Sequence, residues 1–314
     1  MSVYTKLLAS DIERVLQGYA LGKLQSYSGI ADGIENTNYF VHTDQGRFVL
    51  TLFERMNVSE LPYFLELMHF LAERDVPCPD VMVRDDGSML FSVHGKKGCI
   101  VSCLPGRTHE HLNREQLRDS GRAQAKLHLA GRAFPLRRPN PTDMDWMRLT
   151  VGGMWREIAH HYGKEALALL KDELAFQSRQ DLTHLPAGVI HGDLFVDNIL
   201  FEDNAVSGII DFYYAHDAPY AMDLAIALNA QAVQLNEEDV DRMQALLDGY
   251  QQVRRLSESE NEALPVLLRR AALRFWISRL YDAIHPREGA MTQIKDPEEY
   301  RRKLELHRHA GSWI

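Results

Sequence analysis

The hydrophobic pattern of this chain changes near residue 105, and that change restricts the fold to two unlike lobes. Up to that point the pattern is mostly typical of strands, apart from one helical stretch at 59–74. Beyond it, apolar residues mostly recur with the period of helices. The pattern predicts strands at 39–44, 47–53, 80–84, 88–93 and 97–104, and helices at 113–132, 151–178, 218–231, 236–254, 258–284 and 296–309.

This order of elements predicts an α+β chain. An N-terminal lobe at 1–104 is expected to be an antiparallel sheet with one helix, for which Ser59 is the expected N-cap. A larger C-terminal lobe at 105–314 is expected to be mainly helical. The 314 residues are too many for one simple core of ordinary size, which agrees with two lobes.

Charge and hydropathy argue against two classes of partner. The formal net charge is −9, from 35 basic and 44 acidic residues, whereas a nucleic-acid-binding protein shows a basic excess. No apolar run approaches the ~18 residues of a membrane-spanning helix. The N-terminal residues lack the basic-then-apolar pattern of a secretion signal. We therefore expect a soluble, cytoplasmic protein that is a monomer or a homodimer.

Acidic side chains interrupt an apolar stretch of the helical half, IHGDLFVDNILFEDNAVSGIIDFYYA at 190–215. Carboxylates among such neighbours are expected to be poorly hydrated unless something pairs with them. Two short strands between residues 198 and 210 are expected to form a hairpin. That hairpin would bring Asn198 and Asp211 close together and leave Asp193 at the end of the preceding loop.

These three side chains suit one kind of chemistry when they are taken together. An asparagine oxygen and a carboxylate are hard ligands that fit Mg²⁺, which keeps waters and substrate phosphates in its shell. A further carboxylate can accept the proton of a hydroxyl nucleophile. The pattern therefore predicts phosphoryl transfer, with Asp193 as the proton acceptor and Asn198 and Asp211 as metal ligands. For a single acid, a turn residue or a helix cap is the simpler interpretation.

The same residues carry a family resemblance. Protein kinases have a loop Asp, an Asn five residues later and a metal-binding Asp followed by Phe-Gly. Here HGDLFVDNILF and GIIDFYYA resemble the kinases of the aminoglycoside-phosphotransferase and choline-kinase superfamily. They are most similar to its homoserine kinases, which GIENTNYFV and FVLTLFE also resemble. The resemblance covers nearly the whole chain.

The resemblance implies a two-lobed protein-kinase-like fold and a reaction with ATP and Mg²⁺. The γ-phosphoryl group would pass to the side-chain hydroxyl of homoserine, a step toward threonine. One alternative keeps the chemistry with an aminoglycoside or choline as acceptor. Another is an inactive binding module of the same fold, and a third is a metal-dependent phosphohydrolase, which needs more ligands than this stretch supplies.

In the N-terminal lobe the resemblance places the phosphates at the loop GIADGIENTNYF. Gly33 would let backbone N–H groups approach a phosphate, and Asn36, Thr37 and Asn38 would add side-chain donors. An ordinary hairpin turn is the alternative interpretation of these residues.

The strand that follows this loop departs from the usual pattern. Where relatives carry a basic residue, this chain has Thr51, so phosphate neutralisation must depend more on Mg²⁺ and on backbone donors. The adenine is expected between the lobes, against the strand that ends at Leu104.

The acceptor site is expected on the helix at 258–284. Arg274 and Asp282 share one face of that helix, and Arg279 lies three residues before Asp282. Arginine is the better carboxylate clamp because its fork is planar and bidentate, so Arg279, with Arg274 as second choice, is predicted to bind the carboxylate of homoserine. The alternatives are an exposed, salt-bridged face and a clamp near Asp32.

Two further residues are given structural roles. By resemblance, His191 braces the catalytic loop and Asp223 forms hydrogen bonds to it. From the residues alone, His191 is equally a core histidine, and Asp223 is a helix cap or first-turn acid.

Overall fold

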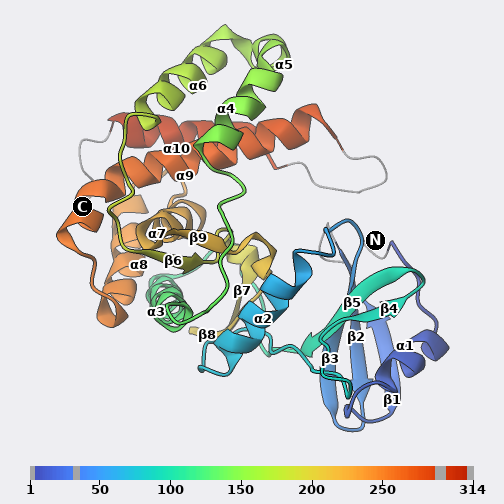
Figure 1. Cartoon of the computed structure of the whole chain (residues 1–314). Helices are drawn as coiled ribbons and strands as arrows, with labels where there is room; N and C mark the ends of the chain where they lie inside the picture. Colours follow the sequence, from blue (N-terminus) through green and yellow to red (C-terminus); the bar gives the residue numbers. More distant parts are fainter. Residues whose placement is uncertain (1–3, 31–35, 287–294, 310–314) are drawn as a thin grey trace. The chain divides into compact units, whose positions relative to one another are not determined.

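The structure is a computed structural model that describes residues 4–30, 36–286 and 295–309 (Figure 1). The chain forms two compact units. Unit 1 contains the described residues up to Gly106 together with Ser207–Ile210, and unit 2 contains the other described residues. The sequence placed this boundary at 104/105. An antiparallel sheet dominates unit 1 and helices dominate unit 2, as the sequence predicts.

Unit 1 is built on a five-stranded antiparallel sheet with the strand order β1-β2-β3-β5-β4. Thr51 on β3 lies opposite Asn38 on β2 and opposite Cys99 on β5. Two helices accompany the sheet, α1 (Ala9–Leu16) and α2 (Leu61–Ala72). The strands are β1 (Leu24–Gly29), β2 (Asn36–Thr43), β3 (Gly46–Phe53), β4 (Phe91–Val93) and β5 (Lys96–Ser102).

Side chains alternate between the two faces of this sheet, and one face is the core of unit 1. Leu50 and Leu52 of β3 are fully buried there together with Ile12 of α1. Burying each such side chain contributes roughly 1.5–3 kcal/mol. The register is therefore strongly specified, because a slip of one residue would exchange this apolar face for the face that carries Asn38 and Thr51.

Three expectations for unit 1 differ from the structure. The predicted strand at 80–84 is only an isolated bridge between Val81 and Val101. Strand β1 was not anticipated, since its sequence LQSYSG is polar and its residues are half-buried or exposed. The N-cap of α2 is Glu60, without a side-chain hydrogen bond, so the expected cap at Ser59 is wrong.

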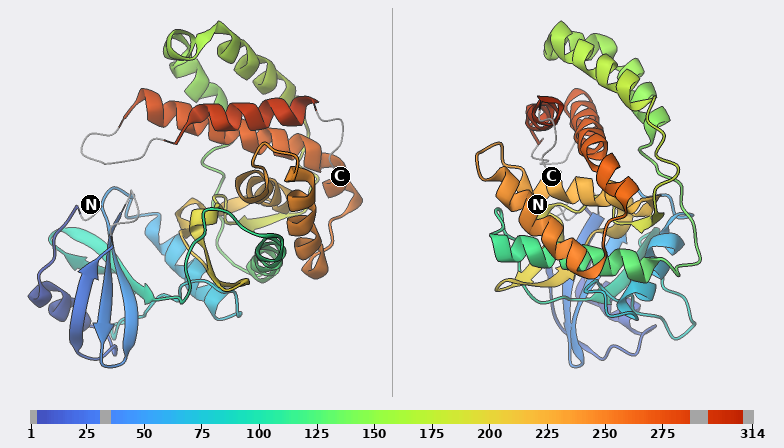
Figure 2. Two further views of the ribbon diagram at one scale, coloured as in Figure 1. Left: turned by 180° about the vertical axis from the view of Figure 1, so that it is seen from behind. Right: turned by 90° about the vertical axis from the view of Figure 1, so that its left-hand side faces the viewer.

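Unit 2 is assembled around the long helix α9 (Glu258–Ile284), whose middle is buried nearly all round. Helix α9 begins with a capping box between Ser257 and Glu260. Figure 2 shows that α10 (Pro297–His309) runs beside it. Helices α3 (Arg114–Gly131), α7 (Tyr220–Ala227) and α8 (Asp239–Val253) complete the packing. None of the described helices is long and apolar enough to cross a membrane.

The predicted helix at 151–178 is wrong as a single element. The segment is divided among α4 (Met144–Gly153), α5 (Trp155–His161) and α6 (Gly163–Gln177). Glycines explain the breaks: α4 ends at a Gly-Gly pair, and Gly163 has a φ of 88°. The predicted helix at 218–231 also changes form, because a π-helical turn at Leu228–Ala232 follows α7.

Two small sheets present the loops that the sequence singled out. Strand β6 (Ala187–Ile190) pairs with β9 (His216–Pro219), and β7 (Ile199–Glu202) pairs with β8 (Ala205–Ile209). The segment 191–198 therefore links β6 to β7, and the segment 210–215 links β8 to β9.

Candidate active site

The segment 191–198, called the catalytic loop below, turns sharply at its second residue. Gly192 has a φ of 77°, in the left-handed region that glycine tolerates best. A Cβ atom at Gly192 would lie 2.9 Å from both His216 Cε1 and the carbonyl oxygen of Tyr214. Both the backbone conformation and the close neighbours therefore require glycine here.

Buried charges hold the peptide groups on either side of Gly192. Its N–H donates to Asp223 Oδ1 at 2.7 Å, and its carbonyl oxygen accepts a hydrogen bond from Arg274 Nη1. Asp223 and Arg274 are both buried and come from α7 and α9. Burial lowers the pKa of Arg274, and the nearby Asp193 carboxylate opposes that shift. One helix therefore fixes each end of this glycine.

Asp223 is the centre of a buried hydrogen-bond network. Its Oδ2 accepts hydrogen bonds from Gln124 Nε2 at 3.0 Å and His128 Nε2 at 2.9 Å, besides the His191 N–H at 3.3 Å. His128 Nδ1 lies 2.7 Å from the Tyr250 hydroxyl. Burial opposes ionisation, but the hydrogen bond and charge of His128 lower the pKa of Asp223. The contact to the catalytic loop is the one that the resemblance implies.

Asp193 and Asn198 are joined across the catalytic loop. Asn198 Nδ2 donates to the Asp193 carbonyl oxygen at 2.8 Å and lies 3.4 Å from its Oδ2. His191 is fully buried, and its Nδ1 accepts the Asp193 N–H at 3.2 Å, so it braces the loop. Because the Asn198 amide nitrogen faces Asp193, its Oδ1 points to the other side, where it can serve as an oxygen ligand.

Asp211 occupies a strained position at the end of the β7–β8 hairpin. Its φ and ψ are 66° and 63°, left-handed values that are uncommon for residues other than glycine and are found at functional sites. The next residue, Phe212, is buried with its ring 4.8 Å from that of His191. Asn198 immediately precedes β7 and Asp211 closely follows β8, so both lie at the same end of the hairpin. Asp211 is exposed, so the expectation of a poorly hydrated carboxylate is wrong there.

The two arginines predicted to clamp a carboxylate both have protein partners. Arg274 holds the catalytic loop, as described above. Arg279 is buried, and its Nη1 donates to Glu299 Oε2 at 2.7 Å and to the Asp296 carbonyl oxygen at 2.8 Å. Burial raises the pKa of Glu299, but Lys303 and Arg279 lower it to about 2. The interpretation of an exposed, salt-bridged face is therefore wrong for the two buried arginines, although Asp282 is exposed, and the predicted carboxylate role stays a prediction.

In unit 1 the predicted donors lie on a strand rather than in a loop. Asn36, Thr37 and Asn38 begin β2, whereas Asp32 and Gly33 lie outside the described residues. The Thr51 hydroxyl donates to Asn38 Oδ1 at 2.8 Å. This bond turns the Asn38 amide nitrogen away from Thr51, which leaves a donor next to the predicted phosphate loop.

Thr37 faces the opposite side of the sheet, because successive side chains of a strand alternate. Its hydroxyl donates to Glu54 Oε1 at 2.6 Å and accepts the N–H groups of Tyr4 and Thr5. Lys96 forms an ion pair with the same Glu54 carboxylate. These contacts give Thr37 a structural role, and its predicted contact with phosphate stays a prediction.

The side chain of Asn36 lies at the start of β2, not in a hairpin turn. It is buried, and its Oδ1 is without a hydrogen-bond partner among the described residues. This oxygen is an acceptor, so the predicted contact with phosphate would have to come from the amide nitrogen of Asn36. Leu104, the predicted adenine contact, is half-buried just beyond β5.

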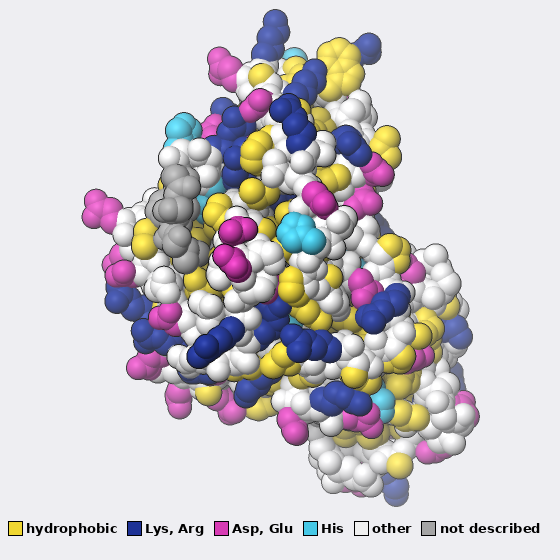
Figure 3. All heavy atoms as spheres, turned by 60° about the vertical axis from the view of Figure 1, so that its left-hand side comes forward, with side chains coloured by type: hydrophobic (Ala, Val, Ile, Leu, Met, Phe, Trp, Pro, Cys, Tyr) yellow, Lys and Arg dark blue, Asp and Glu magenta, His cyan; other side chains and the backbone are white. Residues whose placement is uncertain are grey.

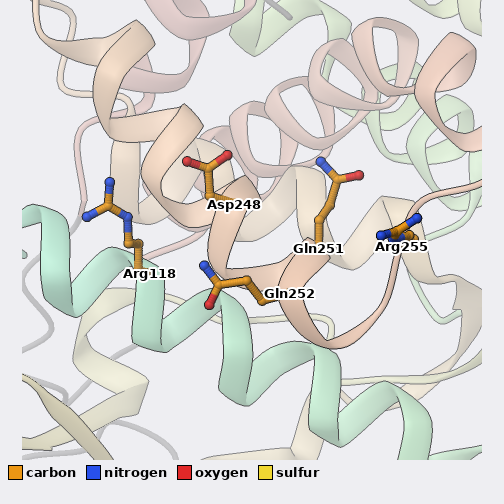
Figure 4. Close-up of a pocket in the computed structure, with 5 residues that line it drawn as sticks. All are labelled: Arg118, Asp248, Gln251, Gln252 and Arg255. Carbon is orange, nitrogen blue, oxygen red and sulfur yellow. The ribbon is translucent and has the colours of Figure 1, made fainter.

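Other surface features do not lead to a second site. The pocket in Figure 4 lies between α3 and α8 and is lined by Arg118, Asp248, Gln251, Gln252 and Arg255. None of these residues belongs to the predicted site. On the face drawn in Figure 3, basic and acidic side chains are interspersed. Within residues 4–30, 36–286 and 295–309, no group of three or more His, Cys, Asp or Glu side chains is placed to hold a metal.

Sequence reasoning missed several residues that shape the site. Gln231, on the π-helical turn, donates to the carbonyl oxygen of Leu194 in the catalytic loop at 2.9 Å. Lys295 pairs with Asp197 of the same loop at 3.0 Å. Neither contact has a local sequence signal, because the partners are 37 and 98 residues apart.

Comparisons with known proteins agree with this geometry. The family model described as "Phosphotransferase enzyme family" matches residues 26–256. The homoserine kinase of Rhizobium meliloti (strain 1021) is 42% identical over 98% of this chain and 95% of its own length. The homoserine kinase of Methylobacillus flagellatus is 42% identical over 97% of this chain and 94% of its own length.

Solved structures support the fold. The spectinomycin phosphotransferase complex with ADP and spectinomycin has a TM-score of 0.72 at 13% identity, covering 97% of this chain and 99% of that chain. A microcompartment-associated aminopropanol kinase has a TM-score of 0.66 at 18% identity, covering 96% of this chain and 94% of that one. The predicted protein-kinase-like fold is therefore confirmed.

Proposed function

We propose that this chain, which belongs to the phosphotransferase enzyme family and within it to the homoserine kinases, phosphorylates L-homoserine. The γ-phosphoryl group of ATP would pass to the side-chain hydroxyl, giving O-phospho-L-homoserine and ADP. The observation that carries the proposal is the catalytic loop, in which Asn198 binds back to Asp193 while Asp223 and Arg274 fix Gly192. This is the rigid support that phosphoryl transfer needs, because positioning supplies much of its rate.

Asp193 is proposed to orient the acceptor hydroxyl and to accept its proton. It is half-buried, its backbone is held at both N–H and carbonyl, and its carboxylate lies within reach of the Asn198 amide. A fixed carboxylate of this kind contributes ~10²–10⁴-fold to a proton transfer.

Asn198 and Asp211 are proposed to hold Mg²⁺. The donor set fits the ion: Asn198 presents an amide oxygen, and Asp211 is an exposed carboxylate at the same end of the hairpin. When bound, Mg²⁺ neutralises charge on the β- and γ-phosphates. The protein's own part is to keep both oxygens fixed, through the Asn198–Asp193 hydrogen bond and the buried Phe212.

The start of β2 in unit 1 is proposed to bind the nucleotide phosphates. Asn38 would present its amide nitrogen, oriented by Thr51, and Asn36 the nitrogen of its buried amide. Gly33 and Leu104 keep the phosphate and adenine roles that the sequence predicts. In this arrangement Thr51 stands where other kinases place a strand lysine, and its hydroxyl orients a neutral amide.

A coupled ADP-release assay with Mg-ATP tests the acceptor. L-homoserine, L-threonine, choline and kanamycin are compared at equal concentration, and the product is identified by ³¹P NMR. We expect release well above the acceptor-free rate with L-homoserine only. Release with choline or kanamycin instead would move the chain to another acceptor class. No acceptor-dependent release, with Mg-ATP still bound, would favour an inactive module, and release of inorganic phosphate from phosphate esters without ATP would favour a phosphohydrolase.

A further inference from the structure

An exposed ion pair lies on the catalytic loop itself. Lys295 Nζ donates to Asp197 Oδ2 at 3.0 Å, and the two side chains are 51% and 56% exposed. Asp197 is part of the tight loop that the Asn198–Asp193 hydrogen bond closes. Both members of the pair belong to unit 2.

The pair contributes little to the fold as it stands. Exposed pairs of this kind are worth roughly 0–1 kcal/mol, because both ions are well hydrated. Several backbone groups at the start of this loop, by contrast, are held by buried partners from other elements: the His191 and Gly192 N–H groups and the Gly192 and Leu194 carbonyl oxygens. The Lys295–Asp197 pair can therefore open and form new pairs at small cost.

The surroundings restrict where Lys295 can move. Its Nζ lies 5.0 Å from the centroid of the Phe195 ring. Phe195 is buried, with its ring 4.8 Å from that of Phe275 and 6.2 Å from that of Tyr300. This aromatic group gives the ammonium a fixed surface beside the loop, through an attraction that persists when Asp197 is released.

The two arginines predicted to clamp the carboxylate already bind protein groups. Arg274 is buried on the Gly192 carbonyl, and Arg279 is buried on Glu299 and the Asp296 carbonyl. Withdrawing either arginine would leave a buried group unpaired, which is strongly destabilising. Lys295, unlike these arginines, can take a new anion without such a loss.

We infer that Lys295 and Asp197 recognise the acceptor as an amino-acid zwitterion, with Lys295 binding the α-carboxylate and Asp197 the α-ammonium. The inference rests on the proposed function and names the residues that select its substrate. The free pair carries the charges complementary to those of a zwitterion, so binding replaces one weak ion pair with two. The hydroxyl at the other end of the short acceptor is then directed along the same loop toward Asp193.

The test pairs substitutions with substrate analogues. Lys295→Met removes the cation, and 3-aminopropan-1-ol is homoserine without the carboxylate. Asp197→Asn removes the anion, and 4-hydroxybutanoate is homoserine without the ammonium. We expect each variant to lose roughly 10- to 100-fold in kcat/KM for L-homoserine, mainly through KM. On the analogue that lacks the matching group, each variant should equal the unsubstituted enzyme, measured as substrate or competitive inhibitor.

Three controls accompany these variants. Lys164→Met removes an exposed lysine of α6, and Asp172→Asn removes the acidic partner of Arg308 in another exposed pair of unit 2. Neither should change the KM for L-homoserine. Lys295→Arg keeps a carboxylate-binding cation and should restore most of the affinity. The thermal midpoint of each variant, with and without Mg-ATP, shows whether it is folded and binds nucleotide.

Each result decides the matter. Losses confined to acceptors that carry the matching charge support the inference. Equal losses on every acceptor would reduce the pair to a loop tether, and unchanged kinetics would remove it from the site. A carboxylate-specific loss in Arg279→Lys with none in Lys295→Met would return the clamp to Arg279. If the unsubstituted enzyme gives no homoserine-dependent ADP release, the proposed function fails before any substitution is made, and the inference fails with it.

Discussion

The catalytic loop of unit 2 and the start of β2–β3 in unit 1 use buried charge in opposite ways. In the catalytic loop, Asp223 and Arg274 bind the backbone on which Asp193 stands. In unit 1, the ion pair between Lys96 and Glu54 holds Thr37 on the core face of the sheet, and on the face with Asn38 strand β3 carries Thr51 rather than a lysine. In the first region the buried charges bind the backbone of the catalytic loop, and in the second the ion pair lies on the core face of the sheet.

This difference explains why the presence of a lysine in the sheet does not by itself indicate a phosphate-binding role. Lys96 lies on β5 of unit 1, and it pairs with Glu54, which faces away from the Asn38 side of the sheet. On the Asn38 side, the residue at the expected lysine position is Thr51, and its hydroxyl orients an amide. The role of a charged residue therefore depends on the face of the sheet, which strand alternation decides.

The largest expected effect comes from the reacting carboxylate. Asp193→Asn keeps the size of the side chain but cannot accept the proton, so kcat should fall ~10²–10⁴-fold. The thermal midpoint and the stabilisation by Mg-ATP should change little, because the loop is held by its backbone. Steady-state kinetics and thermal shift measure both. Near-normal turnover would make Asp193 an ordinary loop residue.

The next effect breaks the support behind that carboxylate. Asp223→Asn leaves the Gly192 and His191 N–H groups and the His128 ring with a poorer acceptor inside the core. Disrupting such a buried charged network is expected to lower the free energy of unfolding by about 3–5 kcal/mol. Urea denaturation measures it. Asp217→Asn, which removes a half-buried carboxylate that binds Arg137 and the Arg138 N–H, is the matched control and should have a smaller effect. An equal loss of unfolding free energy in both variants would mean that the buried network around Asp223 stabilises the fold no more than the contacts of Asp217 do.

The sequence predicted the catalytic loop better than its support. Asp193, Asn198 and Asp211 lie within nineteen positions, so their spacing and the hairpin between them are local signals. The partners that fix the loop come from α7, α9 and the π-helical turn, and such long-range contacts have no local pattern. The breaks between α4, α5 and α6 were missed because the helical period continues across the glycines.

The next effect, of intermediate size, is the dependence of stability on pH, which differs between the two units. Burial lowers the pKa of His216, beside Gly192, to about 4, and that of His307 on α10 also to about 4. In the unfolded chain both titrate near 6.5, so below that pH the unfolded chain binds more protons. Unit 2 should therefore lose stability as the pH falls from about 6.5 to about 4, by up to about 1.4 kcal/mol per pH unit for each histidine.

In unit 1 the corresponding group is an acid. Burial raises the pKa of Glu54, but hydrogen bonds from Lys96, Thr37 and Thr5 lower it overall. Its contribution is present above the unfolded pKa and is lost as the pH falls through the lower folded value. Thermal midpoints from pH 7.5 to 4 measure the loss of stability that is expected from the two histidines of unit 2. His216→Asn keeps a donor for the Tyr214 carbonyl and should flatten the slope, whereas an unchanged slope would mean that His216 is not responsible.

The smallest effect tests the role of Thr51, which stands on β3 where relatives carry a basic residue. Thr51→Val preserves shape but removes the hydroxyl that donates to Asn38 Oδ1, so the amide is free to rotate. A neutral hydrogen bond is worth about 0.5–1.5 kcal/mol, which corresponds to roughly a two- to twelvefold rise in the KM for ATP. The KM for L-homoserine should stay unchanged, since Thr51 belongs to unit 1 and the acceptor residues belong to unit 2. Thr43→Val is the control, because it removes a buried hydroxyl at the far end of β2. If Thr51→Val and Thr43→Val affect the KM for ATP equally, Asn38 does not meet the phosphates, and their charge is balanced by the metal and by backbone donors alone.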